Sequence, residues 1–354
     1  MYRIPWKTKG IVLTAPQPYK KEMADVADFI EKILAPSGVN MIVLQTRYRY
    51  RFQRHPECVG FDPLSFEDVK FLLNVCRRNG IRLVPKMNLF GHQSGIHNTP
   101  SDGILHGLAS GSLDFPDGLI RAYPMFSEPY GDMEFVYSKH LCPTHPLLPS
   151  ILFDLMDEMA DAFEADGMHI GCDEAFLIGM CERCREREPH VLFADYINLL
   201  SGHLRERGIE TMLWSDRLIG TGNSGYANRY EASANGTEKA IELIHKDVIC
   251  CDWHYEKYDV YKSVDIFADH GFRMMVSPWK NMENAKAFLD YAAEHDRGHI
   301  EGYLQTTWCS SGELARHYLY GAPLEWHNMP EIVQTLNEIF LDPKVIGKSF
   351  DAYR

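Results

Sequence analysis

The sequence predicts a (β/α)8 barrel, an α/β fold of the TIM-barrel type, formed by residues 1–354 as a single domain. Three observations support this prediction: eight short β-like runs, helix-like segments between them, and no GxGxxG turn after the first run. Alternating strands and helices favour a parallel sheet, and eight repeats favour closure into a barrel. The alternative, an open Rossmann-like sheet, normally has the glycine-rich turn that is missing here.

The eight expected strands are short, and turn or helix signals separate them. In chain order they cover residues 10–15, 39–45, 81–86, 167–171, 210–214, 248–253, 272–277 and 300–306.

Helical periodicity fills several of the intervals between these strands. Apolar residues recur at the i, i+3, i+4, i+7 spacing over residues 23–34 and again over residues 152–163. Residues 65–68 (SFED) resemble a capping box that opens another helix. Gly80 and Gly208 fall where helices would end before a strand.

The segment 88–146 interrupts this alternation. It is rich in Gly, Pro and His and follows the third expected strand, so it would lie at the C-terminal end of the barrel. Long loops without clear elements are usually functional or lid-like. The alternative is an insertion that only packs against the rim.

Composition and charge exclude several classes of protein. The formal net charge of −13 argues against nucleic-acid binding and against docking on an anionic membrane. No apolar run is long enough for a transmembrane helix, and the N-terminal MYRIPWKTKG lacks the apolar core of a secretory signal. Nine scattered cysteines are interpreted as reduced thiols, so we expect a cytoplasmic protein. A helix expected at 330–340 offers a face for a homodimer, but the oligomeric state stays open.

Four tryptophans follow directly on the later strands. Trp214, Trp253, Trp279 and Trp308 stand at the ends of the fifth to eighth strands, where barrel enzymes carry their active sites. A flat indole surface suits the C–H face of a sugar ring, and each indole also carries an N–H donor. Any single one of them could be a core residue, but four together predict a carbohydrate pocket.

Asp173 and Glu174 follow the fourth strand and are the candidate catalytic pair. Two adjacent carboxylates in an apolar surrounding repel each other, which raises the pKa of at least one of them. A carboxylic acid that is still protonated near neutral pH can act as the general acid of glycoside hydrolysis. Such pairs commonly lie on solvated surfaces, so the position at a strand end is what favours catalysis here.

The string HIGCDE at residues 169–174 resembles the His-x-Gly-Gly-Asp-Glu motif of the glycoside hydrolase family 20 β-N-acetylhexosaminidases. Further segments resemble the family in the same order: FGH at 90–92, LCPTHP at 141–146, MLWSD at 212–216 and TTW at 306–308. The resemblance covers nearly the whole chain in the order of its motifs. It is greatest to the hexosaminidase D branch, whose members are nucleocytoplasmic.

The resemblance implies an exo-acting enzyme that removes terminal β-linked GlcNAc or GalNAc by substrate-assisted retaining catalysis, without a metal or an organic cofactor. Asp173 would orient the 2-acetamido group of the substrate while that group attacks the anomeric carbon. Glu174 would protonate the leaving oxygen and then deprotonate the incoming water. The expected partner is a glycan with a terminal N-acetylhexosamine.

The resemblance also implies a set of substrate-binding residues. Trp214, Trp253 and Trp308 would form the walls of the acetamide pocket, and Tyr255 would donate a hydrogen bond to the acetamide oxygen. The remaining expected members of the set are His92, His169, Asp216 and Trp279. For His92, which would support Glu174, and for His169, a purely structural role is the alternative.

Several positions depart from the family pattern and leave the sugar and its linkage open. Gln17 stands where the first strand would end in a sugar-binding arginine, and Arg47 stands near the expected place of an acidic residue that supports the histidine. Ser310 replaces a glutamate found in many members, with Glu313 further on. Arg47 and Arg49 suggest an anionic substituent on the sugar, although surface arginines are the simpler explanation.

Two weaker signals concern metals. Cys181 and Cys184 form half of a zinc motif, with Cys172 and His190 nearby in the sequence, but unpaired thiols are the simpler interpretation. The histidines of the long segment would allow a catalytic metal cluster, but the first strand lacks the H-x-H of barrel amidohydrolases. These histidines are His92, His97, His106, His140 and His145.

Two alternatives to the leading function remain. One is a barrel glycosidase with altered sugar specificity, and the other is a catalytically weak carbohydrate-binding protein of the same fold. The presence of both Asp173 and Glu174 argues against the second.

Overall fold

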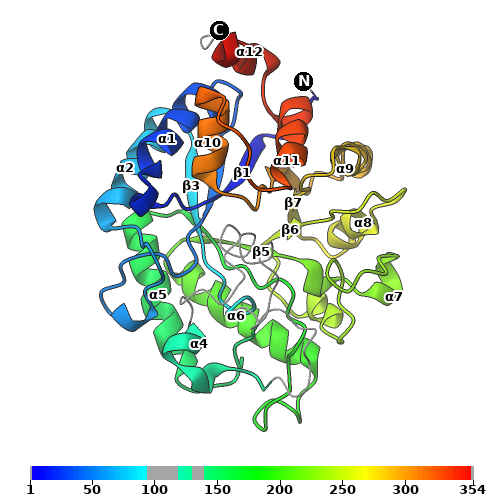
Figure 1. The fold of residues 1–354 in the computed structure, drawn as a ribbon. Helices are drawn as coiled ribbons and strands as arrows, with labels where there is room; N and C mark the ends of the chain where they lie inside the picture. The colour runs from blue at the N-terminus through cyan, green and yellow to red at the C-terminus, as the bar shows by residue number, and fades with distance from the viewer. Residues whose placement is uncertain (1, 94–118, 130–138, 352–354) are drawn as a thin grey trace.

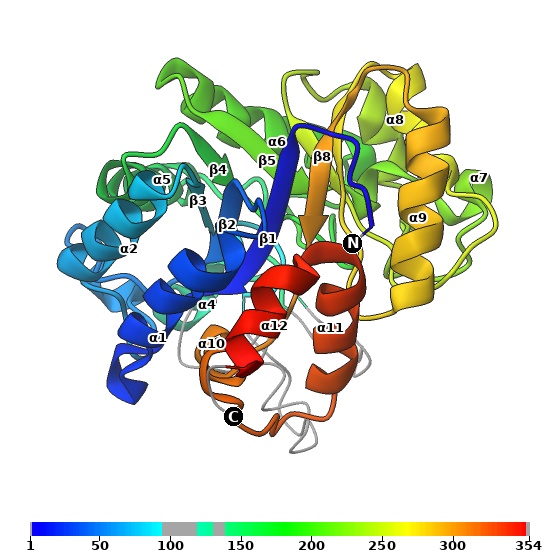
Figure 2. The ribbon, with the colours of Figure 1, turned by 90° about the horizontal axis from the view of Figure 1, so that it is seen from above.

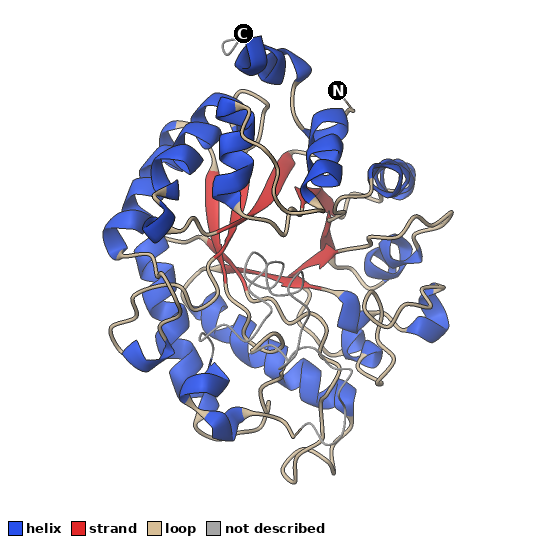
Figure 3. Cartoon of the chain, in the orientation of Figure 1, coloured by secondary structure: helices blue, strands red, loops and turns tan. Residues whose placement is uncertain are grey.

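The computed structural model describes residues 2–93, 119–129 and 139–351. Within these residues eight parallel strands form a closed barrel in sequence order, and β1 pairs with β8 to close it. Helices surround the ring of strands (Figures 1 and 3). All eight expected strands are present, with boundaries shifted by at most two residues, so the prediction of a (β/α)8 barrel is confirmed.

The strands run in the same direction along the barrel. They are β1 Thr8–Thr14, β2 Met41–Gln45, β3 Arg82–Lys86, β4 Gly167–His169, β5 Glu210–Trp214, β6 Ile249–Asp252, β7 Arg273–Val276 and β8 Ile300–Gln305.

The α-helices of the described residues vary from one turn to five turns. They are α1 Glu22–Phe29, α2 Phe66–Arg78, α4 Leu119–Ala122, α5 Leu148–Phe163, α6 Pro189–Glu206, α7 Thr221–Ser224, α8 Lys262–Asp269, α9 Met282–His295, α10 Ser311–Tyr320, α11 Met329–Thr335 and α12 Pro343–Asp351. Short 3-10 or π segments are η1 Pro18–Lys20, η2 Ile30–Leu34, η3 Pro56–Cys58, η4 Pro124–Phe126, η5 Asp216–Leu218, η6 Glu238–Glu242 and η7 Leu336–Phe340.

The strands contribute to two separate apolar cores, because successive side chains of a strand point to opposite faces. One set fills the inside of the barrel and includes Val12, Val43, Val84, Met212 and Leu304. The intervening residues pack outward against the helices and include Ile11, Leu13, Ile42, Leu44, Leu83 and Leu213. The inner set is topped by Trp214, Trp253, Tyr255 and Trp308, which places these aromatic rings at the C-terminal end of the barrel.

The helix signals in the sequence are also confirmed. In α5, Leu152, Leu155 and Met159 are fully buried, and each such side chain contributes about 1.5–3 kcal/mol by its burial. The Ser65 hydroxyl accepts a hydrogen bond from the Asp68 N–H (3.1 Å), and the Asp68 carboxylate accepts one from the Ser65 N–H (2.8 Å). This reciprocal pair is the capping box that opens α2.

The alternation of strands and helices fails at one place in the described chain. Between β5 and β6 there is no long helix, and the connection is made by η5, α7 and η6. Gly220, Gly222 and Gly225 lie at the start of this interval. Glycine in a helix interior costs about 1 kcal/mol relative to alanine, so this stretch favours turns.

The C-terminal helices α10, α11 and α12 lie together beside the barrel, with α10 next to α1 (Figure 2). The expected helix at 330–340 exists as α11 continued by η7. Its apolar residues Ile332, Leu336, Ile339 and Phe340 are buried in the core of the same chain. The face suggested for a homodimer is therefore occupied within the protomer.

Only parts of the long segment 88–146 lie within the described residues, and His97 and His106 lie outside them. The parts that are described include α4 and η4. No helix in the described ranges is both long and apolar enough to cross a membrane.

Candidate active site

Asp173 and Glu174 lie in the loop after β4, and the imidazole of His92 lies between their carboxylates. His92 Nε2 is 3.0 Å from Asp173 Oδ2 and 3.2 Å from Glu174 Oε2. The exposed fractions of the three side chains are 8% for His92, 15% for Asp173 and 11% for Glu174. Both carboxylates are therefore largely buried beside the histidine.

The backbone of the β4 loop explains how two adjacent side chains reach the same histidine. In an extended strand they would point to opposite faces. Here Gly171, Cys172 and Glu174 have φ angles of 73°, 70° and 51°, in the left-handed region. A Cβ on Gly171 would lie 3.0 Å from the Met87 carbonyl oxygen, so both the turn and the close approach require glycine.

The loop after β3 supplies His92 and packs directly on the β4 loop. A Cβ on Gly91 would lie only 2.7 Å from the Asp173 carbonyl oxygen, so the two chains can approach this closely only because residue 91 is glycine. His92 itself has a φ of 57°. Its carbonyl oxygen accepts a hydrogen bond from Arg47 Nη2 (2.7 Å), which fixes the loop from the side of β2.

Of the two arginines after β2, Arg47 is buried, so the explanation as a surface residue was wrong for it, and Arg49 is half-buried. Arg47 is 2% exposed and holds the backbone of His92 rather than its ring. The Arg49 guanidinium donates to the carbonyl oxygens of Ala15 (2.9 Å) and Pro16 (3.0 Å) and so fixes the loop after β1. The structure assigns both side chains to loop positioning.

The charges around the pair determine which form each group takes. Burial alone would raise the pKa of Asp173, but the charge and hydrogen bond of His92, together with Lys86, hold it well below its usual range. Burial would lower the pKa of His92, but the two carboxylates raise it to about 9. Burial lowers the pKa of Lys86 to about 8 against the opposing charge of Asp173. The repulsion expected to raise at least one of the two pKa values does not raise that of Asp173, because two cations lie beside it.

Asp216 connects the pair to the aromatic residues. Its Oδ2 accepts hydrogen bonds from the Glu174 N–H (2.9 Å) and from Arg217 Nε (2.6 Å), and its Oδ1 accepts one from Trp253 Nε1 (3.1 Å). The residue is 2% exposed, and burial raises the pKa of its carboxyl to about 6 although Arg217 lowers it. Both carboxylate oxygens bind protein donors, so Asp216 positions other residues of the site.

His140 is a positioning residue that the sequence did not single out for this role. Its Nε2 lies 2.8 Å from the Glu174 carbonyl oxygen and supports the same strained turn. Burial lowers the pKa of His140 to about 4, so the ring is neutral. The only signal was its place beside the LCPTHP string, which the sequence linked to the family and not to Glu174.

The aromatic residues expected to line the pocket form one contiguous cluster. Trp308 Nε1 donates to the Tyr255 hydroxyl oxygen (2.6 Å), and the Trp214 and Trp308 rings meet edge to face with centroids 5.5 Å apart. The Trp253 and Tyr255 rings lie 4.7 Å apart. Lys86 Nζ lies 5.8 Å from the Trp214 ring and 5.7 Å from the Trp308 ring, which brings the cluster next to Asp173.

Two further residues expected to bind substrate have structural contacts of their own. His169 is fully buried under Trp214, with ring centroids 4.4 Å apart, and its Nδ1 accepts a hydrogen bond from the Gly171 N–H (3.1 Å). Trp279 Nε1 donates to the Thr307 carbonyl oxygen (3.0 Å). Trp279 also lines, with Tyr255, a cavity of about 490 Å³ on the side of α9.

The residues that depart from the family pattern make structural contacts within the chain. The Gln17 N–H donates to Glu22 Oε2 (2.8 Å) near the start of α1. Ser310 is the N-cap of α10 and accepts a hydrogen bond from the Glu313 N–H (3.2 Å). Glu313 in turn accepts a hydrogen bond from the Glu325 N–H (2.7 Å).

Two groups of side chains in the described chain have the ligand types and spacing for a metal ion. His92, Asp173 and Glu174 form one group. These three side chains lie close together because His92 contacts both carboxylates directly. The other group joins Cys181 and Cys184 to Glu128 and Cys142, and not to Cys172 or His190. Of the remaining described histidines in the long segment, His145 accepts a local hydrogen bond from the Leu147 N–H (3.3 Å).

The sequence matches the model of the glycosyl hydrolase family 20 catalytic domain over residues 43–317. A search of the curated proteins found no match.

Solved structures of hexosaminidases share the fold. A β-N-acetylhexosaminidase from Bacteroides fragilis aligns over 94% of this chain and 70% of its own, with 14% identity and a TM-score of 0.59. A chitobiase from Flavobacterium johnsoniae aligns over 99% of this chain and 51% of its own (17% identity, TM-score 0.63). An exo-β-N-acetylglucosaminidase from Vibrio harveyi, in complex with N-acetylglucosamine, aligns over 94% and 54% (13% identity, TM-score 0.61). This chain thus spans about half the length of the last two proteins.

Proposed function

This chain belongs to glycosyl hydrolase family 20, and on that basis we propose that it is an exo-acting β-N-acetylhexosaminidase. Its substrate would be a glycan with a terminal β-linked GlcNAc or GalNAc. Residues 1–354 would form a single catalytic barrel, with Asp173 and Glu174 as the catalytic residues. The hexosaminidases and the chitobiase with the same fold support this choice of substrate class.

In this proposal the 2-acetamido oxygen of the substrate is the nucleophile. It attacks the anomeric carbon, the glycosidic bond breaks, and positive charge develops on the acetamide. Asp173 orients the acetamide N–H and stabilises that charge, which requires an ionised carboxylate. The lowered pKa of Asp173, held down by His92 and Lys86, supports this role.

Glu174 would give its proton to the leaving oxygen and then take a proton from the water that opens the cyclic intermediate. This water attacks the anomeric carbon and restores the acetamide, so the proton that Glu174 lost is regained in the second step. The contact with His92 and the bond from the Glu174 N–H to Asp216 support a fixed position for this side chain. Correct placement of the acid is what makes proton transfer efficient.

The short distance between the two carboxyl groups supports retention of configuration. The facing oxygens of Asp173 and Glu174 lie within 4.8 Å of each other. In an inverting enzyme the two carboxyl groups are about 6.5–9.5 Å apart, which leaves room for the attacking water. Two carboxyl groups this close leave no room for that water between them, which favours retention over inversion.

Trp214, Trp253 and Trp308 would enclose the acetamide, and Tyr255 would donate its hydroxyl hydrogen to the acetamide oxygen. The Tyr255 oxygen accepts a hydrogen bond from Trp308, so its own hydrogen remains to be donated. Burial raises the pKa of Tyr255, which keeps the hydroxyl protonated.

The observation that carries the proposal is the position of one buried imidazole between the two adjacent carboxylates. The test is hydrolysis of N-acetyl-β-glucosaminides and β-galactosaminides with leaving groups of different basicity. We expect Glu174→Gln to lower kcat by about 10²–10⁴-fold on alkyl glycosides, because their leaving group needs a proton. The loss should be much smaller on a dinitrophenyl glycoside, which leaves as an anion. Asp173→Asn should slow both substrates to a similar extent.

The matched control is Glu67→Gln, the same change on the exposed first turn of α2, which should hydrolyse both substrates at the wild-type rate. Equal rates for wild type and Glu174→Gln would remove Glu174 as the acid. Turnover of plain β-glucosides in place of the N-acetyl sugars would favour a barrel glycosidase of altered specificity. Sugar binding without turnover would favour a carbohydrate-binding protein.

A further inference from the structure

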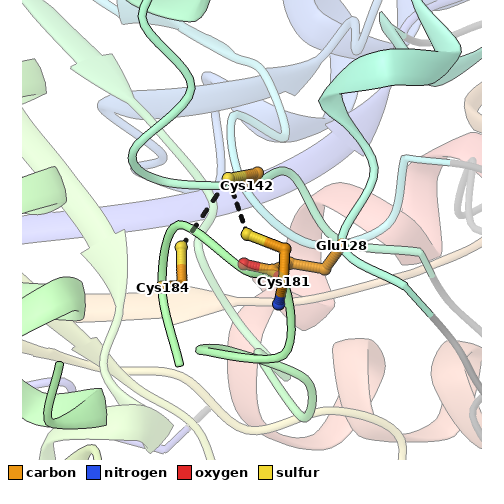
Figure 4. Close-up of side chains that lie close together, drawn as sticks. All are labelled: Glu128, Cys142, Cys181 and Cys184. Atoms are coloured by element: carbon orange, nitrogen blue, oxygen red, sulfur yellow. Dashed lines mark hydrogen bonds between the residues drawn. The ribbon is translucent and has the colours of Figure 1, made fainter. Parts of the chain in front are cut away.

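Four side chains with metal-binding atoms meet between two loops of the barrel, apart from the proposed catalytic pair. Glu128 and Cys142 come from the segment after β3, and Cys181 and Cys184 come from the loop after β4 (Figure 4). The sulfur of Cys142 lies 3.4 Å from that of Cys181 and 3.6 Å from that of Cys184. One ligand atom from each of the four residues lies within 4.8 Å of all the others.

These distances distinguish a metal site from a disulfide. A disulfide needs two sulfurs about 2.05 Å apart, and all three cysteines are free thiols. Thiolates around a tetrahedral zinc ion, with Zn–S bonds of about 2.3 Å, lie about 3.8 Å from one another. The two distances of 3.4 and 3.6 Å from the Cys142 sulfur, with all ligand atoms within 4.8 Å of one another, are close to the zinc arrangement.

Glu128 completes the set as the fourth ligand. Its side chain is fully buried, and Oε2 accepts a hydrogen bond from the Cys181 N–H (2.8 Å). Oε1 is buried and accepts no hydrogen bond of ordinary geometry from the described residues, and the thiols of Cys181 and Cys184 lie within reach of the carboxyl group. A buried carboxylate oxygen without a partner costs about 1–3 kcal/mol or more, and coordination of a cation would remove that cost.

We propose that Glu128, Cys142, Cys181 and Cys184 bind one Zn²⁺ ion in a structural site. Cys181 and Cys184 are placed by a tight turn in which the Cys184 N–H donates to the Cys181 carbonyl oxygen (3.0 Å). Four protein ligands leave no open position for water or substrate, which is the arrangement of structural rather than catalytic zinc. This site is independent of the proposed hydrolase activity.

The surroundings supply what a zinc–thiolate site requires. The Thr144 hydroxyl lies 3.1 Å from the sulfur of Cys184 and can donate a hydrogen bond to a thiolate there. Arg183 and Arg185 flank Cys184 in the sequence and place positive charge in the same loop. On binding, Zn²⁺ would replace up to three thiol protons, which are released to solvent.

The ion would fix the β3 and β4 loops to each other at a point close to the catalytic pair. His140, whose Nε2 contacts the Glu174 carbonyl oxygen, is two residues before Cys142. Cys181 and Cys184 lie in the same loop as Glu174. One cation at this place would therefore hold together the two chain segments that carry His140 and Glu174.

The test is the zinc content of the full-length protein, purified without chelator and measured by inductively coupled plasma mass spectrometry. We expect about one zinc per chain in the wild type and in Cys58→Ser. Cys58 is equally buried but lies outside the cluster, so it is the matched control. Cys142→Ser and Cys184→Ser should lose the ion. Glu128→Gln should also weaken Zn²⁺ binding. Loss of a hydrogen-bond partner outside the ligand set costs about 10–100-fold in affinity, and loss of a ligand should cost more.

Cobalt substitution keeps the test decisive if the serine variants do not fold. Wild-type protein loaded with Co²⁺ should show sulfur-to-cobalt charge-transfer absorption and the intense visible bands of tetrahedral cobalt. Wild type that binds no Zn²⁺ after addition of one equivalent would overturn the proposal. So would a disulfide within the cluster, detected as a mass loss of about 2 Da in protein kept under reducing conditions, or a zinc content unchanged in both serine variants.

Discussion

The contact between His92 and the two carboxylates predicts a specific dependence of stability on pH. The pKa of His92 is raised from 6.5 to about 9, and at about 1.36 kcal/mol for each pKa unit this corresponds to about 3 kcal/mol. Because the folded value is the higher one, this stabilisation is fully present below pH 6.5. It is lost progressively as the pH rises through about 9. In His92→Gln, which cannot carry the charge, this part of the pH dependence should be absent.

The assay is the free energy of unfolding in urea, measured for wild type and His92→Gln from pH 6 to pH 10. The difference between the two proteins should shrink by about 3 kcal/mol across this range. His254 also has its pKa raised to about 9, by Asp252 and Glu231 acting against burial, and it contributes the same slope to both proteins. Titration of ¹⁵N-labelled imidazoles by NMR gives the same information without unfolding. A constant stability difference from pH 6 to pH 10, or a His92 resonance that titrates near 6.5, would refute the reasoning.

Three further predictions concern the loops and the pocket. Gly91→Ala should lower kcat and cost about 1–3 kcal/mol of stability, because its Cβ would lie 2.7 Å from the Asp173 carbonyl oxygen. The control is Gly202→Ala on α6, where the added Cβ meets open space. It should raise stability by up to about 1 kcal/mol in thermal unfolding. Tyr255→Phe should lower kcat/KM about tenfold or more on N-acetylated substrates, since a buried hydrogen-bond partner is lost; an unchanged kcat/KM would contradict the assigned contact. The first sugar released should be the β-anomer by ¹H NMR, and initial release of the α-anomer would exclude retention.

The fold could be predicted almost completely from the sequence, because each strand has a local signal in its own residues. Runs such as residues 210–214 are short, apolar and bounded by turn residues, and β5 covers the same residues. The absence of a long helix between β5 and β6 also follows from local sequence signals. The glycines that favour a turn there are visible in the sequence, and no helical periodicity was found in that interval.

The site was less predictable, because its chemistry depends on contacts between distant loops. Asp173 and Glu174 were predicted from a local string, and both are largely buried. Repulsion between the adjacent carboxylates does not raise the pKa of Asp173, because His92 lies 81 positions away in sequence and only 3.0 Å away in space. Arg47 looked like a surface charge for the same reason, since nothing in its neighbourhood along the chain indicates burial.

The proposed zinc ligands Glu128, Cys142, Cys181 and Cys184 were hard to predict for the same reason, since they come from distant parts of the chain. Cys181 and Cys184 were visible as half of a motif, but Cys142 lies 39 positions from Cys181 in the sequence. No spacing rule connects it or Glu128 to the pair. Only the packing of the β3 segment on the β4 loop brings the four side chains together.

Asp216 holds the main chain of Glu174 with one oxygen and the indole of Trp253 with the other. A change that moves Trp253 to admit a bulkier or differently substituted sugar would also disturb the carboxylate that positions the proposed proton donor. Selection for a new substrate would therefore act on turnover at the same time. Variants that broaden what this barrel accepts should be found more readily among residues that do not share a hydrogen bond with Asp216.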